Sequence, residues 1–120
     1  MSLANYDQIT AAQRGMQEAI DELDSLKDKI GMARTVIDFA EARRRTAHSK
    51  LVVLYALPKV SAALAEHQAR ADARFGAESD KILRETAAAE SVKAAWELAR
   101  IKFECARSIL SSERSLLELR

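Results

Sequence analysis

The sequence predicts an all-α protein of three helices, a long antiparallel helical hairpin (coiled coil) with a short middle helix, in a single domain of residues 1–120. Its composition is typical of long helices, since 120 residues contain three glycines, one proline and 31% charged residues. Apolar residues recur at every seventh position in two segments, which indicates helices wound along a seam. These ladders are Ile9, Met16, Leu23, Ile30, Ile37 and Ile82, Ala89, Trp96, Phe103, Leu110, Leu117.

The first helix is expected over residues 5–56. Asn5 can accept from the first backbone N–H groups while Gln8 reaches back, and nothing stops the helix before Pro58. Gly15 and Gly31 weaken it by about 1 kcal/mol each. With Ile9 at the first core position of the heptad, the second position is mostly alanine, and the core set is Ala12, Ala19, Leu26, Ala33, Ala40, Ala47, Leu51 and Leu54.

A short helix over residues 58–75 and a long one over residues 79–119 complete the fold. Pro58 suits the first turn of the middle helix, and Gly76 the left-handed residue that ends it. The apolar face of the middle helix is expected at Val60, Ala63, Leu64, His67 and Ala71. Ser79 and Asp80 then provide the start of the last helix.

Antiparallel packing of the two long helices covers both seams. The expected register places Trp96 near Ile37 and Phe103 near Ile30, with the small residues Ala33 and Ala40 facing the two rings. Arg44 falls at a core position near Glu90, where an ion pair would fix the alignment.

The last helix carries a basic row, Lys93, Arg100, Arg107 and Arg114, at seven-residue spacing. Each of Glu90, Glu97 and Glu104 precedes a member of the row by three residues, the spacing of an intrahelical ion pair. Two interpretations stay open. The row is a solvated, self-paired helix face, or it contacts a phosphate backbone or an acidic partner surface.

The densest basic run is Arg43, Arg44, Arg45, His48 and Lys50. Clustered cations suit phosphate contacts, but no aromatic residue is interleaved with the run to stack bases. The candidate residues for contact with nucleic acid or an acidic partner are Arg43, Arg45 and Lys50, together with the basic row.

Met32, Val36 and Phe39 form an apolar strip outside the seam, and residues 51–57 are apolar nearly all round. Two helices cannot cover both regions, and uncovered patches of this kind mark interfaces. We expect the middle helix over residues 51–57, a protein interface at Met32, Val36 and Phe39, and a homo-oligomer with a further protein partner.

Little in the sequence points to chemistry. His48 and His67 belong to no metal-ligand spacing, the three glycines are isolated, and Cys105 has no neighbouring base. We therefore expect no enzyme, catalytic residue, cofactor, metal or small-molecule substrate. With a net charge of +1, one cysteine and no long apolar run, we expect a cytoplasmic protein without membrane contact.

Three segments, RRRTAHSKL, SAALAEHQARADARF and WELARIKFECARSILSSERSLLELR, follow one another in an order that resembles small alanine-rich helical proteins encoded by phages and prophages. Such proteins occur among early recombination and replication genes. The resemblance implies a non-enzymatic accessory protein in the bacterial host cell, assisting single-strand DNA recombination or replication through protein or DNA contacts. The alternatives are an inhibitor or adaptor that binds a host protein through an apolar helix face, and a structural subunit of a virion or filament.

Overall fold

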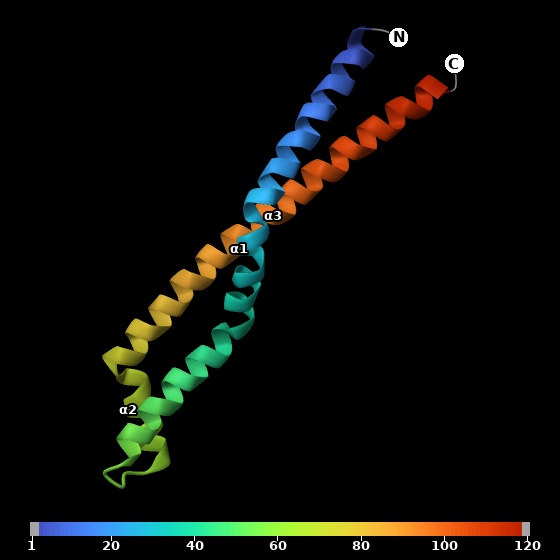
Figure 1. The fold of residues 1–120 in the computed structure, drawn as a ribbon. Coiled ribbons are helices and arrows are strands. Elements are labelled where there is room, and N and C mark those ends of the chain that lie inside the picture. Colours follow the sequence, from blue (N-terminus) through green and yellow to red (C-terminus); the bar gives the residue numbers. More distant parts are fainter. Residues whose placement is uncertain (1–2, 119–120) are drawn as a thin grey trace. The chain divides into compact units, whose positions relative to one another are not determined.

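The computed structural model describes the backbone of residues 3–118 and the side chains of residues 6–116, and it is all-α. Its helices are α1 (Leu3–Ala56), α2 (Ala62–Ala71) and α3 (Ala73–Glu118). Two long helices joined by a short middle helix confirm the predicted fold class (Figure 1). The side chains of Asn5 and Leu117 lie outside the described residues, and α1 begins two residues before Asn5.

The described residues fall into two compact units. Among the described residues, unit 1 comprises residues 3–31 and 92–118, and unit 2 comprises Met32–Ser91. In each unit a segment of α1 runs antiparallel to a segment of α3, and unit 2 also contains α2 (Figure 1). The boundary in α1 falls at Gly31, one of the two glycines expected to weaken the helix.

The core of unit 1 is an alanine seam. Ala12 and Ala19 of α1 are buried, as are Ala99 and Ala106 of α3, while the bulkier Met16 is half-buried. Alanine at the buried positions of both helices lets the backbones approach closely, because the distance between helix axes depends on the contacting side chains. The predicted alanines at the second core position of α1 are confirmed here at Ala12 and Ala19, and α3 contributes alanines of its own.

The core of unit 2 combines alanines with two larger aliphatic residues. Leu51 of α1 and Ile82 of α3 are buried, and α2 adds Ala65 and Ala69, neither of which is exposed at all. The buried face of α2 is therefore not the predicted one, since Leu64 is 44% exposed. The two small side chains let α2 lie close to the long helices, which a face containing Leu64 would prevent.

The chain reverses between α1 and α2 around Pro58. Proline cannot continue the helix, and α1 ends at Ala56 as predicted. Lys59 takes the left-handed conformation, with φ of 64°, while its N–H donates to the carbonyl of Ala56 at 3.0 Å. Ser61 then caps α2, because its hydroxyl accepts from the N–H of Leu64 at 3.2 Å.

The predicted boundaries of the middle helix are wrong. α2 covers Ala62–Ala71 instead of residues 58–75, and Gly76 lies inside α3 without a positive φ. The reason is Asp72, whose carboxylate and carbonyl both accept bonds from the first turn of α3. This residue caps α3 seven residues before Ser79, the expected cap, and removes the need for a glycine stop.

The predicted register is also wrong. Trp96 and Phe103 share a hollow with Leu23 and Lys27 in unit 1, whereas Ile37 belongs to unit 2. The expected partnership of Arg44 with Glu90 is absent from the described residues, where Arg44 pairs with Glu41.

A contact at the start of α3 agrees with this displacement. Phe75, in its first turn, already contacts His48 of α1, with ring centroids 5.6 Å apart. Leu54, also expected in the core, is 48% exposed, whereas Leu51 one turn earlier is buried.

Replacing Ala99 by leucine tests the alanine seam. Ala99 has no exposed surface, so the larger leucine side chain would overpack the contact between the helices. We expect a loss of about 1–3 kcal/mol in the free energy of unfolding. Urea denaturation followed by circular dichroism measures it. The matched control is Ala94→Leu at an exposed site of the same helix, expected to change stability by less than about 0.5 kcal/mol. Equal effects of the two substitutions would contradict the seam.

Replacing Lys59 by glycine tests the reversal after α1. A side chain disfavours the left-handed conformation, so Lys59→Gly should stabilise the folded state by about 0.5–1 kcal/mol, net of the flexibility glycine adds to the unfolded chain. Thermal unfolding measures the change. Lys59→Ala removes the same charge but keeps the Cβ, and it should give no such gain.

Candidate functional site

Two neighbouring hollows open on α1 in unit 2. The first, of about 540 Å³, is lined by Phe39, Arg43, Lys50, Arg74 and Glu78 among others. The second, of about 490 Å³, includes Arg45 and shares Lys50 with the first. We call the group Phe39, Arg43, Arg45, Lys50 and Arg74 the basic face.

Helix geometry explains why these residues meet. Phe39, Arg43, Thr46, Lys50 and Val53 follow one another at alternating intervals of four and three residues along α1. Side chains at these intervals lie on one side of a helix. Arg74 reaches the same hollow from the first turn of α3.

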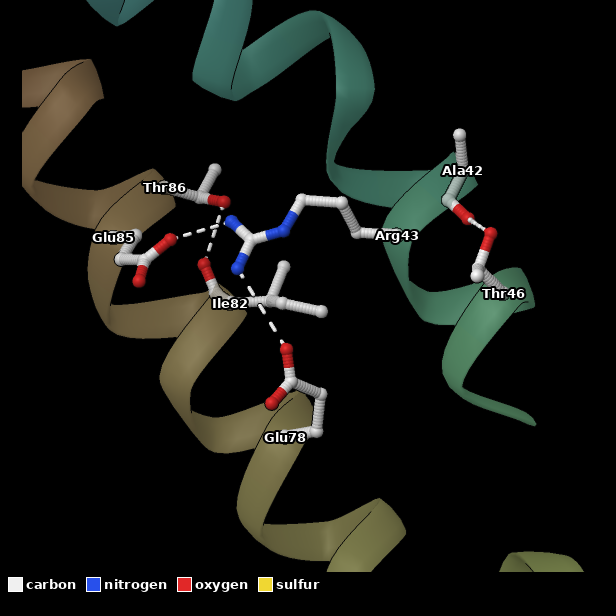
Figure 2. Close-up of polar contacts among 7 residues, drawn as sticks. All are labelled: Ala42, Arg43, Thr46, Glu78, Ile82, Glu85 and Thr86. Atoms are coloured by element: carbon white, nitrogen blue, oxygen red, sulfur yellow. Dashed lines mark hydrogen bonds and ion pairs between the residues drawn. The ribbon is translucent and has the colours of Figure 1, made fainter. Parts of the chain in front are cut away.

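Arg43 links α1 to α3 (Figure 2). Its Nη1 donates to Oε2 of Glu85 at 2.5 Å, and its Nη2 lies 3.7 Å from Oε1 of Glu78. The hydrogen bond from Arg43, more than the nearby positive charge, holds the pKa of Glu85 below its usual range. Arg43 is thus a half-buried clamp between the helices as well as part of the basic face.

Arg74 is held by Asp72, whose side chain is only 9% exposed. The guanidinium donates through Nε and Nη2 to the two carboxylate oxygens at 3.1 and 2.9 Å, and the backbone N–H of Arg74 adds a bond at 2.7 Å. The hydroxyl of Tyr55 donates to the same carboxylate at 2.5 Å. This cluster joins the end of α1 to the junction of α2 and α3.

The shared carboxylate changes two pKa values. Hydrogen bonds from Arg74 and then Tyr55 hold the pKa of Asp72 far below its usual range. The bond to Asp72 raises the pKa of Tyr55, because ionising the phenol removes the donated proton and places two negative charges side by side.

Arg45, Lys50 and Arg74 are the exposed cations of the basic face, and Arg45 and Lys50 differ from Arg74 in their pairing. Within the described part of the chain neither makes an ion pair, whereas Arg43, Arg44 and Arg74 each do. The charges of Arg45 and Lys50 are therefore available to solvent or to a bound anion.

The basic row on α3 belongs to unit 1, whereas the basic face belongs to unit 2. Arg100 pairs with Glu97 at 3.5 Å and Arg107 with Glu104 at 3.2 Å, confirming the intrahelical spacing predicted for these two pairs. Arg107 and Arg114 also line a hollow of about 650 Å³ with Met16. Lys93 is exposed.

The apolar strip is mostly exposed, with Met32 at 74%, Phe39 at 60% and Val36 half-buried. Phe39 also lines the hollow that contains Arg43 and Lys50. No aromatic residue is interleaved with the basic run in the sequence, but the fold places Phe39 beside it. Phe39 precedes Arg43 by four residues, about one helical turn, so the two side chains are neighbours on α1. Residues four positions away from the basic run, and not only those within it, would therefore have revealed this aromatic neighbour.

The two histidines and the cysteine lie in different environments. His48 packs edge-on against Phe75, as expected of a packing residue, and its buried Nε2 has no hydrogen-bond partner within the described residues. His67 and Cys105 are exposed. The described residues contain no group of three or more His, Cys, Asp or Glu placed to hold a metal ion. None of the described helices combines the length and apolar character that crossing a membrane requires.

Comparisons with protein-family models, curated proteins and solved structures gave no match to this chain.

Titration of Tyr55 tests the cluster around Asp72. In the Tyr6→Phe variant Tyr55 is the only phenol. We expect its ionisation midpoint, followed by ultraviolet absorbance, to lie above the ordinary value of about 10. Adding Asp72→Asn should lower this midpoint, because a neutral acceptor no longer opposes the phenolate.

The same bond has a consequence for stability. Since the pKa of Tyr55 is higher in the folded state, its stabilisation is fully present below about pH 10 and is lost as the pH rises through the folded value. Tyr55→Phe should remove this alkaline loss from the unfolding profile. A midpoint unaffected by Asp72→Asn would show that the two side chains do not interact.

Proposed function

We propose that this protein is a non-enzymatic accessory protein of phage or prophage origin that acts in the cytoplasm of a bacterial host. In this proposal the basic face binds single-stranded DNA during recombination or replication. The order of basic, alanine-rich and final helical segments supports the origin, and the chemistry of the basic face supports the ligand.

The proposal rests on the position of Phe39, which lies among cationic side chains. Its ring is 60% exposed and lines one hollow together with Arg43, Lys50 and Arg74. Proteins that bind single strands without sequence preference combine such cations, which track the phosphates, with aromatic rings on which bases stack.

The distribution of charge supports the same ligand. Arg43, Arg45, Lys50 and Arg74 line the two hollows with a single carboxylate, Glu78. The whole chain carries a net charge of only +1, so this face concentrates positive charge locally. Pairing with carboxylates holds Arg43 and Arg74 in place, while Arg45 and Lys50 can contact phosphates without first breaking an ion pair with a described residue.

A second candidate is an adaptor that binds a host protein. It is favoured by the exposure of Met32 and Phe39, which form one apolar strip with Val36 on α1. Large apolar side chains gathered on one surface are typical of protein interfaces. Phe39 belongs to both surfaces, so its replacement affects either candidate.

DNA binding is tested by fluorescence anisotropy with a labelled oligodeoxythymidine. The double substitution Arg45→Glu and Lys50→Glu should weaken binding at least about tenfold at low salt, and wild-type affinity should fall as salt rises. Phe39→Ala should cost about 1–3 kcal/mol of binding free energy through lost stacking.

The matched control reverses two charges in unit 1, Arg100→Glu and Arg107→Glu. Both arginines already pair with glutamates of their own helix, so the control should weaken binding much less than the variant of the basic face. Equal losses would mean that only overall charge matters. Two results together would favour the adaptor. The wild type would not bind DNA, and after nuclease treatment of a host lysate it would still capture a host protein that Phe39→Ala does not capture.

A further inference from the structure

A second apolar stripe runs along α3 in unit 1, outside the seam with α1. It contains Leu98, Cys105, Ile109 and Leu116, of which the three aliphatic residues are 51%, 45% and 53% exposed. The free monomer leaves all four in contact with solvent. An apolar stripe of this length on a charged helix is typical of a buried helix face.

The spacing of the residues in the stripe is the same in both chain directions. Its members follow one another at intervals of seven, four and seven residues, so their positions are symmetric about the midpoint between Cys105 and Ile109. Because α3 is a continuous helix over this range, these intervals place all four side chains on one face. A second copy in the opposite direction would therefore set Leu98 against Leu116 and Cys105 against Ile109.

The charges beside the stripe have the same symmetry. Lys102 lies three residues after the buried Ala99, and Glu113 lies seven residues after the buried Ala106, so both side chains are on the side of the stripe nearer the seam with α1. Neither makes an ion pair within the described residues. When the stripe is reversed by a two-fold axis, Lys102 of each copy comes beside Glu113 of the other, within one residue of the apolar register.

The wall of the hollow formed by α1 admits another helix. It presents Ala11, Ala12, Gly15 and Ala19 beside the polar Gln8, Glu18 and Glu22, and a Cβ built on Gly15 would meet nothing within 4 Å. The hollow has a volume of about 780 Å³. Small residues on one wall and exposed aliphatic side chains on the other leave room for a helix to contact both.

We propose that unit 1 is the interface of a symmetric homodimer, in which the α3 stripes of two copies pack antiparallel. Each α3 then also lies in the hollow of the other copy. The occupant is a second copy and not another protein, because both the apolar spacing and the Lys102–Glu113 charges are complementary to themselves. A two-fold interface requires such self-complementarity.

Sedimentation equilibrium of the full chain tests the dimer. Ile109→Glu buries a carboxylate at the centre of the stripe and should raise the dimer dissociation constant at least about tenfold. The matched control is Leu83→Glu, which places the same charge at an exposed leucine of α3 in unit 2 and should leave the constant unchanged. Circular dichroism checks that both variants keep their helices.

Charge reversal tests the direction of pairing. Lys102→Glu and Glu113→Lys should each weaken the dimer, because each places like charges together across the two-fold axis. The double variant restores opposite charges and should recover affinity close to wild type. A monomeric wild type at millimolar concentration, or a dimer insensitive to Ile109→Glu, would overturn the proposal. Additive losses in the double charge variant would do the same.

Discussion

The structure depends on a core made chiefly of alanine. Most of the buried apolar residues in the described chain are alanines, with only Ile30, Leu51 and Ile82 as larger members. A buried alanine removes one methyl group from water, about 0.8 kcal/mol, so such a seam stabilises by close backbone approach more than by area. With alanine at the buried positions, larger apolar side chains such as Met32, Phe39 and Ile101 stay exposed.

A shallow seam of similar small residues specifies alignment weakly, and polar contacts supply what it lacks. In unit 2, Arg43 ties α1 to α3 through Glu85 and Glu78, and Asp72 ties the end of α1 to the start of α3 through Tyr55. Charged pairs are better suited to fixing a register than to adding stability, because desolvation offsets much of their attraction. These contacts also hold Arg43 and Arg74 in the basic face.

The margins left by the seam are the surfaces on which function would depend. Unit 2 offers an aromatic ring among cations, which suits a polyanion with stackable bases. Unit 1 offers an apolar stripe with self-complementary charges. The two proposals use different units and different chemistry, so each can fail without the other.

The sequence by itself determined that two long helices flank a short one, that α1 ends before Pro58, and which alanines of α1 form its seam, because these depend on local backbone chemistry and on a seven-residue period. It did not determine the register, since an alanine ladder fits its partner in several alignments. Only the tertiary structure decided that Asp72 starts α3, that Arg43 and not Arg44 crosses between the helices, and that Phe39 joins the basic face. Each depends on which residues of distant segments meet, and periodicity carries no information about that.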